Sequence, residues 1–223
     1  MTGSVPAPLP ELLAANRSCV ACTLRPGCAA PVPGEWVGEA PAQAHSPSLL
    51  LIADAPGAEE DRQGRPFAGR AGEELRALLG DAGLGRAPLF LTTLVKCRPP
   101  AHRDPSPAEA QTCAERWLRP QLAALRPRLI LTMGNAATRE VLGTGPGDTG
   151  ITRLRGRWQR AAPAYGGALL LPLLHPATAA RDEARLPGGP WSLLRGDLKE
   201  AAAVWRGERA ARPAAPPAPP SLF

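Results

Sequence analysis

The chain has 223 residues, and 44% of them are hydrophobic, so it can bury a core and is not disordered throughout. Its 26 basic and 20 acidic side chains give a net charge of +6, which is compatible with nucleic-acid binding without establishing it. No apolar run reaches the roughly 20 residues that cross a bilayer, and the first residues lack the basic and apolar regions of a signal peptide. We therefore expect a cytoplasmic protein.

The first part of the chain shows little regular structure. Residues 1–9 are predicted to be flexible, and a short helix is predicted over 10–18, where Pro10 suits the first turn and Glu11 suits the helix dipole. From Cys19 to Pro47 the sequence has no clear periodicity and contains several Cys, Gly and Pro residues. This stretch is predicted to be an irregular wrap that a metal holds in place.

Four short, continuous apolar runs are typical of strands that are buried on both faces. They cover residues 49–53, 89–95, 128–132 and 168–174. Helices are predicted between and after these runs. Helical spacing over 71–82 places Leu75, Leu78 and Leu79 on one face, and Ser106 with Glu109 forms a capping box at the start of a helix over 106–125. Further helices are predicted after Gly134-Asn135 and over 191–205.

The alternation of strands and helices predicts an α/β fold, with one domain over 10–206 and a central four-stranded parallel sheet flanked by helices. The carboxyl ends of parallel strands meet at one edge, where such folds place their sites. Asp54, Thr93, Gly134 and His175 all fall at that edge. Residues 207–223 are rich in Ala and Pro and are predicted to be a disordered tail.

The five cysteines are candidate metal ligands, because a reducing compartment disfavours disulfides. Cys19 and Cys22 form a C-x-x-C unit, which places two thiolates on one turn. Cys97 and Cys113 belong to distant segments that would have to converge, so ordinary buried thiols are the alternative. The spacing leaves open an iron–sulfur cluster or zinc, and Cys28 could compete as a ligand.

Three stretches resemble the family 4 uracil-DNA glycosylases, the iron–sulfur branch of the uracil-DNA glycosylase superfamily. The runs 54–61 and 64–72 are similar to the family patterns GEAPG-x-x-ED and GRPF-x-G-x-AG. The other two stretches are Val95-Lys-Cys-Arg-Pro-Pro100, followed by Cys113, and His175-Pro-Ala177. The resemblance implies a uracil-DNA glycosylase-like fold and a [4Fe–4S] cluster on Cys19, Cys22, Cys97 and Cys113.

The resemblance also implies an activity: hydrolysis of the N-glycosidic bond of uracil in DNA, which starts base-excision repair. The uracil must first be swung out of the base stack, and Phe67 resembles the aromatic residue that stacks on it. His175 resembles the histidine that hydrogen-bonds the departing uracil, while Asp54 or Glu60 would stabilise the sugar cation and position water. Further contacts are expected from Ala55, Thr93 and His102 to the substrate, and from Arg98, Arg103 and Arg181 to DNA phosphates.

Three positions depart from the family pattern. Asp54 replaces a glutamate, and Thr93 replaces an asparagine whose amide can both donate to and accept from the base, so base discrimination should weaken. His102 stands where the family usually has Asn and aligns with the nucleophilic histidine of the X-type uracil-DNA glycosylases. Two alternatives to hydrolysis follow: covalent capture of the abasic sugar through His102, and a catalytically weak iron–sulfur module that binds DNA lesions.

Two segments in the C-terminal part of the chain, residues 177–180 and 219–223, suggest a preferred substrate and a partner. Residues 177–180 are mostly alanine and make a poor wedge for the gap that a flipped base leaves, so single-stranded or mismatched uracil is the expected substrate. The terminal Pro219-Pro-Ser-Leu-Phe223 resembles the Leu-Phe end of peptides that sliding clamps bind, which makes a clamp a candidate partner. The protein is expected to be a monomer.

Overall fold

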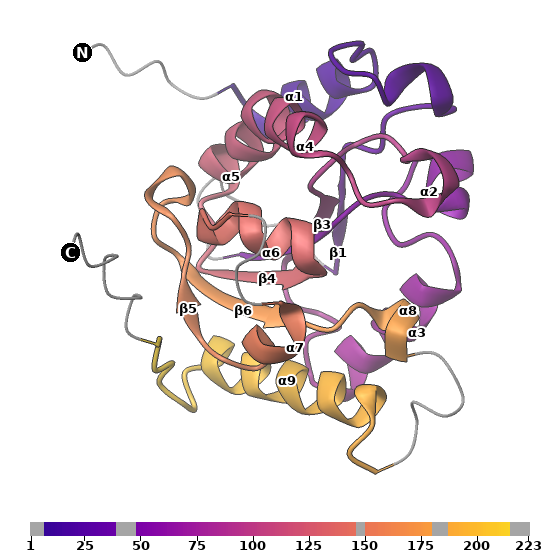
Figure 1. Ribbon diagram of the computed structural model, residues 1–223. Coiled ribbons are helices and arrows are strands. Elements are labelled where there is room, and N and C mark those ends of the chain that lie inside the picture. The colour runs from indigo at the N-terminus through magenta and orange to yellow at the C-terminus, as the bar shows by residue number, and fades with distance from the viewer. Residues whose placement is uncertain (1–6, 39–47, 146–149, 180–186, 215–223) are drawn as a thin grey trace, which may run out of the picture.

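Six strands form one mixed sheet in the order β1-β3-β2-β4-β6-β5 in the computed structural model, which describes residues 7–38, 48–145, 150–179 and 187–214 (Figure 1). The four central strands run parallel: β3 (Leu89–Thr93), β2 (Leu49–Ala53), β4 (Leu129–Met133) and β6 (Leu169–Leu173). Two short strands pair antiparallel at the edges, β1 (Glu35–Val37) with β3 and β5 (Gln159–Arg160) with β6.

The edge strands correct two expectations. The sheet is mixed and six-stranded rather than four-stranded and parallel, and the cysteine-rich stretch expected to be irregular contains β1. Strands of two or three residues are too short to show an alternating pattern in the sequence. Trp36 of β1 packs edge-on against Phe90 of β3, with ring centroids 5.3 Å apart, so apolar contact joins this segment to the sheet.

Successive residues of the buried strands point to opposite faces of the sheet. Leu49 and Leu51 pack in a core with α3 (Arg70–Asp81) and α9 (Pro190–Trp205). Leu50 and Ile52 pack in a second core on the other face. That core contains a continuous helical run and one shorter helix: α4 (Pro107–Cys113), a π-helical turn (Ala114–Leu118), α5 (Arg119–Leu125) and α6 (Asn135–Leu142).

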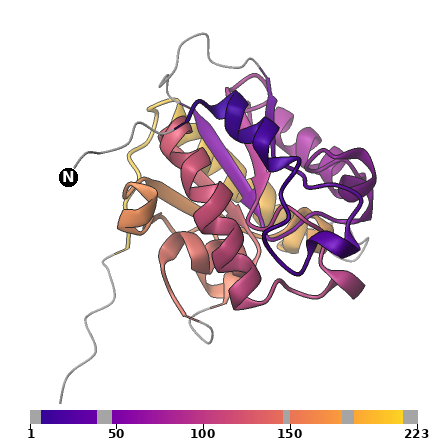
Figure 2. The same ribbon diagram turned by 90° about the horizontal axis from the view of Figure 1, so that it is seen from above.

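The local signals for the helices are confirmed. Leu75, Leu78 and Leu79 are buried on α3. The Ser106 hydroxyl accepts from the Glu109 N–H, and the Glu109 carboxylate accepts from the Ser106 N–H, which completes the capping box of α4. The remaining helices are short: α1 (Leu9–Asn16), which lies beside α5 in Figure 2, α2 (Ala58–Gln63), α7 (Ile151–Leu154) and α8 (Pro176–Ala179).

The strand order fixes where a site can form. From β2 the chain crosses to β3 on one side and then to β4 on the other, so the carboxyl ends of β2 and β4 form the topological switch point. The chain continues past α9, and the Ala214 N–H donates to the Trp158 carbonyl oxygen at 2.8 Å. Within the described ranges, no helix has the length and apolar character needed to span a membrane.

Candidate active site

A cavity of about 440 Å³ opens at the carboxyl edge of the sheet. Its wall comes from the ends of β2, β3 and β6 and from the loops that follow them. The residues on this wall that the sequence predicted are Asp54, Ala55, Glu60, Phe67, Thr93, His102, Arg103 and His175. The expectation that Asp54, Thr93 and His175 meet at one edge is confirmed.

Asp54 directly follows β2 and lies at the switch point. One of its carboxylate oxygens accepts from the Ala137 N–H in the first turn of α6 at 2.7 Å. A side chain at Gly134, where φ is +104°, would overlap the Asp54 carboxylate, so the glycine lets α6 approach. Burial raises the pKa of Asp54 to about 6, although the Ala137 hydrogen bond and Arg139 oppose the rise. Asp54 is therefore an acid that changes charge close to neutral pH.

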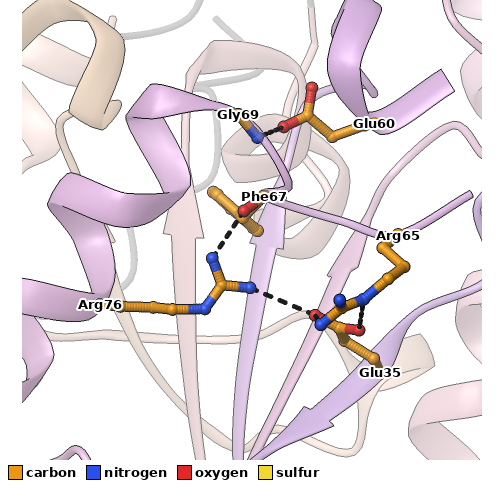
Figure 3. A network of polar contacts seen from close by, with 6 residues as sticks. All are labelled: Glu35, Glu60, Arg65, Phe67, Gly69 and Arg76. Carbon is orange, nitrogen blue, oxygen red and sulfur yellow. Dashed lines mark hydrogen bonds and ion pairs between the residues drawn. The ribbon is translucent and has the colours of Figure 1, made fainter. Parts of the chain in front are cut away.

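Glu60 also lies on the wall, but both of its oxygens are engaged. One accepts from the Gly57 N–H and the other from the Gly69 N–H, each at 3.0 Å. Figure 3 shows the second of these bonds. Glu60 therefore connects the loop after β2 to the loop before α3, and its charge acts on the cavity from a fixed position.

Phe67 lies on the loop between α2 and α3, and its backbone is left-handed, with φ of 53°. Its ring belongs to the core that contains α3 and also lines the cavity. The ring is nearly parallel to that of His175, with an interplanar angle of 19° and centroids 6.4 Å apart. Phe67 is thus at once a core residue and a residue of the cavity wall.

His175 follows β6, and its tautomer can be assigned from its contacts. The Nδ1 atom accepts from the Ala177 N–H at 3.2 Å, so the proton of the neutral ring is on Nε2. Burial lowers the pKa of His175, while the charge of Glu60 partly opposes this shift. At neutral pH the ring is therefore uncharged and can donate one hydrogen bond from Nε2.

Thr93 ends β3 and is buried on the cavity wall. Its hydroxyl donates to the Val95 carbonyl oxygen at 2.8 Å, so it can only accept from a ligand. Its own carbonyl oxygen accepts from the Lys96 ammonium at 2.5 Å, and the same ammonium donates to the Thr92 hydroxyl. Lys96 is fully buried, and this burial lowers its pKa to about 8.

The loop from Arg98 to Pro105 forms the other side of the cavity. His102 is left-handed, with φ of 54°, and its Nε2 lies 3.3 Å from a guanidinium nitrogen of Arg98. Because arginine can only donate, this contact is a hydrogen bond when the imidazole Nε2 serves as the acceptor. Arg98 itself is not on the cavity wall. Arg181 and residue 180 of the proposed wedge lie outside the described residues, as does the clamp-like segment 219–223.

Arg103 has an internal partner that the sequence did not predict. Its guanidinium makes a two-pronged pair with the Glu109 carboxylate, at 2.7 and 2.8 Å, and this pairing is the main reason that the pKa of Glu109 falls to about 2. The Thr23 hydroxyl donates to the same carboxylate at 2.9 Å. Glu109 therefore ties the C-x-x-C segment to the loop and helix that carry Cys97 and Cys113.

The five cysteines form no disulfide and lie in or against the core on the α4–α6 side of the sheet. Burial raises the pKa of Cys97, and the neighbouring Cys28, Cys22 and Cys113 raise it further. Burial also raises the pKa of Cys113, to about 11, although Lys96 opposes this shift. The thiols are therefore close enough to affect one another.

The surroundings of the sulfur atoms allow a test of whether they fit an iron–sulfur cluster. The Lys96 N–H donates to Cys113 Sγ at 3.3 Å, and the Trp117 indole N–H donates to Cys19 Sγ at 3.1 Å. In the part of the chain that the structure describes, no three His, Cys, Asp or Glu side chains are arranged around one metal ion. A cubane cluster binds each thiolate at a different iron, so its ligands need not converge on one point. An all-thiolate set with N–H donors fits such a cluster.

Local sequence patterns do not mark several residues of the site region. Asp104 lines the cavity and helps to raise the pKa of Asp54. Its place between His102 and Pro105, in a loop already singled out, was the available signal. Glu35, Arg76 and Glu109 act through contacts between distant segments, and no local pattern marks such contacts.

Comparison with known proteins agrees with this geometry. The family model described as "Uracil DNA glycosylase superfamily" matches residues 40–199. Three proteins named "Type-4 uracil-DNA glycosylase" are similar over most of their length. The one from Sulfurisphaera tokodaii is 34% identical over 73% of this chain and 71% of its own. The corresponding values are 32%, 76% and 81% for the one from Archaeoglobus fulgidus, and 36%, 73% and 73% for the one from Saccharolobus solfataricus.

The matched region contains every strand of the sheet except β1 and every predicted cavity residue. The motifs that carry the resemblance in the sequence are the same segments that the fold brings to the cavity. The chain therefore belongs to the uracil-DNA glycosylase superfamily and, within it, to the type-4 family.

Proposed function

We propose that this protein excises uracil from DNA by hydrolysing the N-glycosidic bond, leaving an abasic site for base-excision repair. One observation carries the proposal: a neutral imidazole, a half-buried carboxylate and an aromatic ring line a single cavity at the carboxyl edge of the sheet. Cleavage of the bond builds negative charge on the base and positive charge on the sugar, so the two groups can oppose each charge where it develops. The names of the relatives support the same activity.

His175 acts on the base. Once the nucleotide is swung out of the stack, the uracil lies against Phe67, and the Nε2 proton of His175 points to the uracil O2. The bond from Ala177 to Nδ1 fixes this tautomer. Because burial lowers the pKa of His175, the ring stays neutral, and its hydrogen bond strengthens as negative charge collects on O2.

Asp54 acts on the sugar and on water. Above a pH of about 6 it is ionised, and the Ala137 N–H holds one of its oxygens while the carboxylate orients the attacking water. Its negative charge also stabilises the sugar cation. Glu60 contributes charge but no proton transfer, because two backbone N–H groups occupy its oxygens.

Thr93 determines how strictly the base is read. Its hydroxyl oxygen can accept from the uracil N3–H, but its proton is used by Val95 and cannot be donated to O4. Discrimination between uracil and other deaminated bases is therefore weaker than an amide would give. Ala55, next to Asp54 on the wall, keeps that side of the cavity open.

We assign Cys19, Cys22, Cys97 and Cys113 as the residues that would hold a [4Fe–4S] cluster. When bound, such a cluster supplies four iron–thiolate bonds that join the segment after α1 to the residues on either side of the Arg98–Pro105 loop. The chain's own residues prepare this site, because Trp117 and Lys96 donate to two of the sulfur atoms. Cys28 lies beside Cys97 and stays outside the assigned set.

DNA containing uracil is the proposed partner, and single-stranded or mismatched uracil, which is already partly unstacked, is the favoured substrate. Arg98, Arg103 and Arg181 are assigned to the flanking phosphates. Arg103 can keep its pair with Glu109 in this role, since its side chain is 42% exposed. We further propose a cytoplasmic monomer whose C-terminal segment binds a sliding clamp.

One observation favours a second function, covalent capture of the abasic sugar. His102 lies on the cavity wall with its Nε2 3.3 Å from an Arg98 nitrogen, and a neutral imidazole is a competent nucleophile. The bond from Arg98 to that nitrogen competes with nucleophilic attack, so hydrolysis is the function that the geometry supports best.

A single assay separates these functions. The protein is incubated with a labelled uracil oligonucleotide, and the products are run on a denaturing gel with and without alkali. Hydrolysis predicts an alkali-labile product in both the wild type and His102→Ala. Covalent capture predicts a gel shift that survives denaturant and is lost in His102→Ala, whereas a lesion-binding module gives neither result and would overturn the proposal.

A further inference from the structure

Phe67 has a backbone conformation that must be held from outside. Its φ of 53° lies in the left-handed region, which is unfavourable for a residue with a bulky side chain. Such a conformation persists only where neighbouring groups fix it. The ring lies on the cavity wall, so whatever fixes this backbone also sets where the ring meets a base.

The contacts that fix Phe67 come from three directions. On one side, Glu60 accepts from the Gly69 N–H two residues further along. On another, Gly72 at the start of α3 packs so closely that any side chain there would overlap the Phe67 carbonyl group. From the third side, the Arg76 guanidinium donates to the Phe67 carbonyl oxygen at 2.8 Å.

Arg76 is itself held by an acid from a distant part of the chain. Its other terminal nitrogen lies 3.3 Å from a carboxylate oxygen of Glu35, the first residue of β1 (Figure 3). Glu35 is mostly buried, with 19% of its side chain exposed, and it also pairs with Arg65 at 2.7 Å. The guanidinium of Arg76 therefore bridges the cysteine-rich segment, α3 and the loop that carries Phe67.

We infer that Arg76 and Glu35 are positioning residues that hold Phe67 where its ring stacks on the extruded base, and this inference rests on the role proposed above for Phe67. Neither side chain lines the cavity, and the contact that links them to its wall is the hydrogen bond from Arg76 to the Phe67 carbonyl oxygen. Glu35 lies on β1, in the stretch that follows Cys19, Cys22 and Cys28. The position of this stretch therefore affects the position of Phe67, through the contacts of Glu35 with Arg76 and of Arg76 with Phe67.

The test compares a variant of Glu35 with variants of its two arginine partners, Arg76 and Arg65. Arg76→Met removes the donor to Phe67, Glu35→Gln weakens the anchor of Arg76, and Arg65→Met removes a partner of Glu35 that does not touch Phe67. We expect Arg76→Met to raise the KM for a uracil oligonucleotide and the inhibition constant of free uracil about tenfold, with kcat within about twofold. Glu35→Gln should raise both constants about threefold, while Arg65→Met stays at the wild-type values.

A double variant distinguishes positioning from general loss of structure. In a Phe67→Ala background, Arg76→Met should change neither constant further, because no ring remains to be positioned. Thermal melting of each variant, and Arg76→Lys as a milder change, checks folding. The inference is overturned if Arg76→Met behaves like Arg65→Met, or if its full effect remains in Phe67→Ala. If Phe67→Ala alone leaves both constants unchanged, the stacking role in the proposed function fails as well.

Discussion

The cavity at the sheet edge and the cysteine region are built in different ways. The loops after β2 are held by short-range hydrogen bonds to the backbone: Glu60 accepts from the N–H groups of Gly57 and Gly69. The cysteine region is held by side chains that are far apart in sequence, such as the Thr23 hydroxyl on Glu109 and the Trp117 indole on Cys19. The difference shows that Glu60 organises the loops after β2 from within their own segment, whereas the contacts named here for the cysteine region join distant segments. Long-range contacts also reach the cavity, from Ala137 to Asp54 and, through Arg76, from Glu35 to Phe67.

The largest effect is expected from substitution of His175 in the cavity. His175→Ala removes the only donor assigned to the uracil O2, so kcat should fall by about 10²- to 10³-fold. His175→Gln keeps an N–H donor and should recover part of that loss. Single-turnover excision from a uracil oligonucleotide measures both, and rates within threefold of the wild type would show that the ring is not at the base.

The next largest effect is expected from substitution of Cys97 in the cysteine region. Cys97→Ser should abolish the brown colour and the visible absorbance of the protein, because the assigned cluster loses one of its four thiolates. Cys28→Ser is the matched control, since Cys28 is buried beside Cys97 but is not assigned as a ligand. Iron analysis should find iron in Cys28→Ser only. Colourless wild-type protein with stoichiometric zinc would contradict the iron–sulfur assignment.

A smaller effect is expected at Glu109, which links the two arms of the cysteine region. Glu109→Gln weakens the pairs with Arg103 and Thr23 and should lower the free energy of unfolding at neutral pH by about 1–3 kcal/mol. The pKa of Glu109 is lowered to about 2, so its contribution is complete above its ordinary value near 4.5 and is lost as the pH falls towards 2. Urea unfolding should therefore show that the difference in the free energy of unfolding between the wild type and Glu109→Gln narrows below pH 4.5.

Glu109→Gln also tests whether the cavity depends on the cysteine region. If the cavity is organised independently of the Glu109 link, the inhibition constant of free uracil should stay within about twofold in this variant. A tenfold rise would show that the cavity depends on this link.

The smallest effect concerns base reading. Thr93→Asn introduces an amide that can donate and accept, and it should sharpen the preference for uracil over other deaminated bases by roughly tenfold. Competition between oligonucleotides that carry uracil, hypoxanthine or xanthine measures the preference. An unchanged order would show that Thr93 is not at the reading position.

Much of the cavity could be predicted from the sequence, because its residues follow strands that local patterns mark. The apolar run 49–53 and the acid after it place Asp54 at the sheet edge, and the same reasoning places Thr93 and His175 there. The capping box of α4 was visible for the same reason. In each case the signal and the structure lie within a few residues of each other.

The parts that escaped depend on contacts between distant segments or on very short elements. The pairing of β1 with β3 involves three residues, and no alternation can be seen over that length. The tie between Glu109 and Thr23 spans 86 positions, and that between Arg76 and Glu35 spans 41. Arg103 was assigned to DNA from its charge and its place near the sheet edge, and its partner Glu109 became evident only in the structure.

The most direct test of the account is the pH dependence of Asp54, measured on the rate and on stability. Burial raises the pKa of Asp54 from 3.8 to about 6, so its protonated form favours the fold, and that contribution is lost as the pH rises through about 6. Asp54→Asn should therefore be more stable than the wild type by about 2–3 kcal/mol at pH 8 and equal to it below pH 4.

The decisive measurement is the single-turnover rate of uracil excision between pH 4.5 and 8. We expect the wild-type rate to fall about tenfold per pH unit below pH 6, as the carboxylate that orients water becomes protonated. Asp54→Asn should be slower by at least about 10² at pH 8, with no such pH dependence. A wild-type rate that stays flat from pH 8 to 4.5, or an Asp54→Asn variant that is as fast as the wild type, would show that the Asp54 carboxylate does not orient the attacking water.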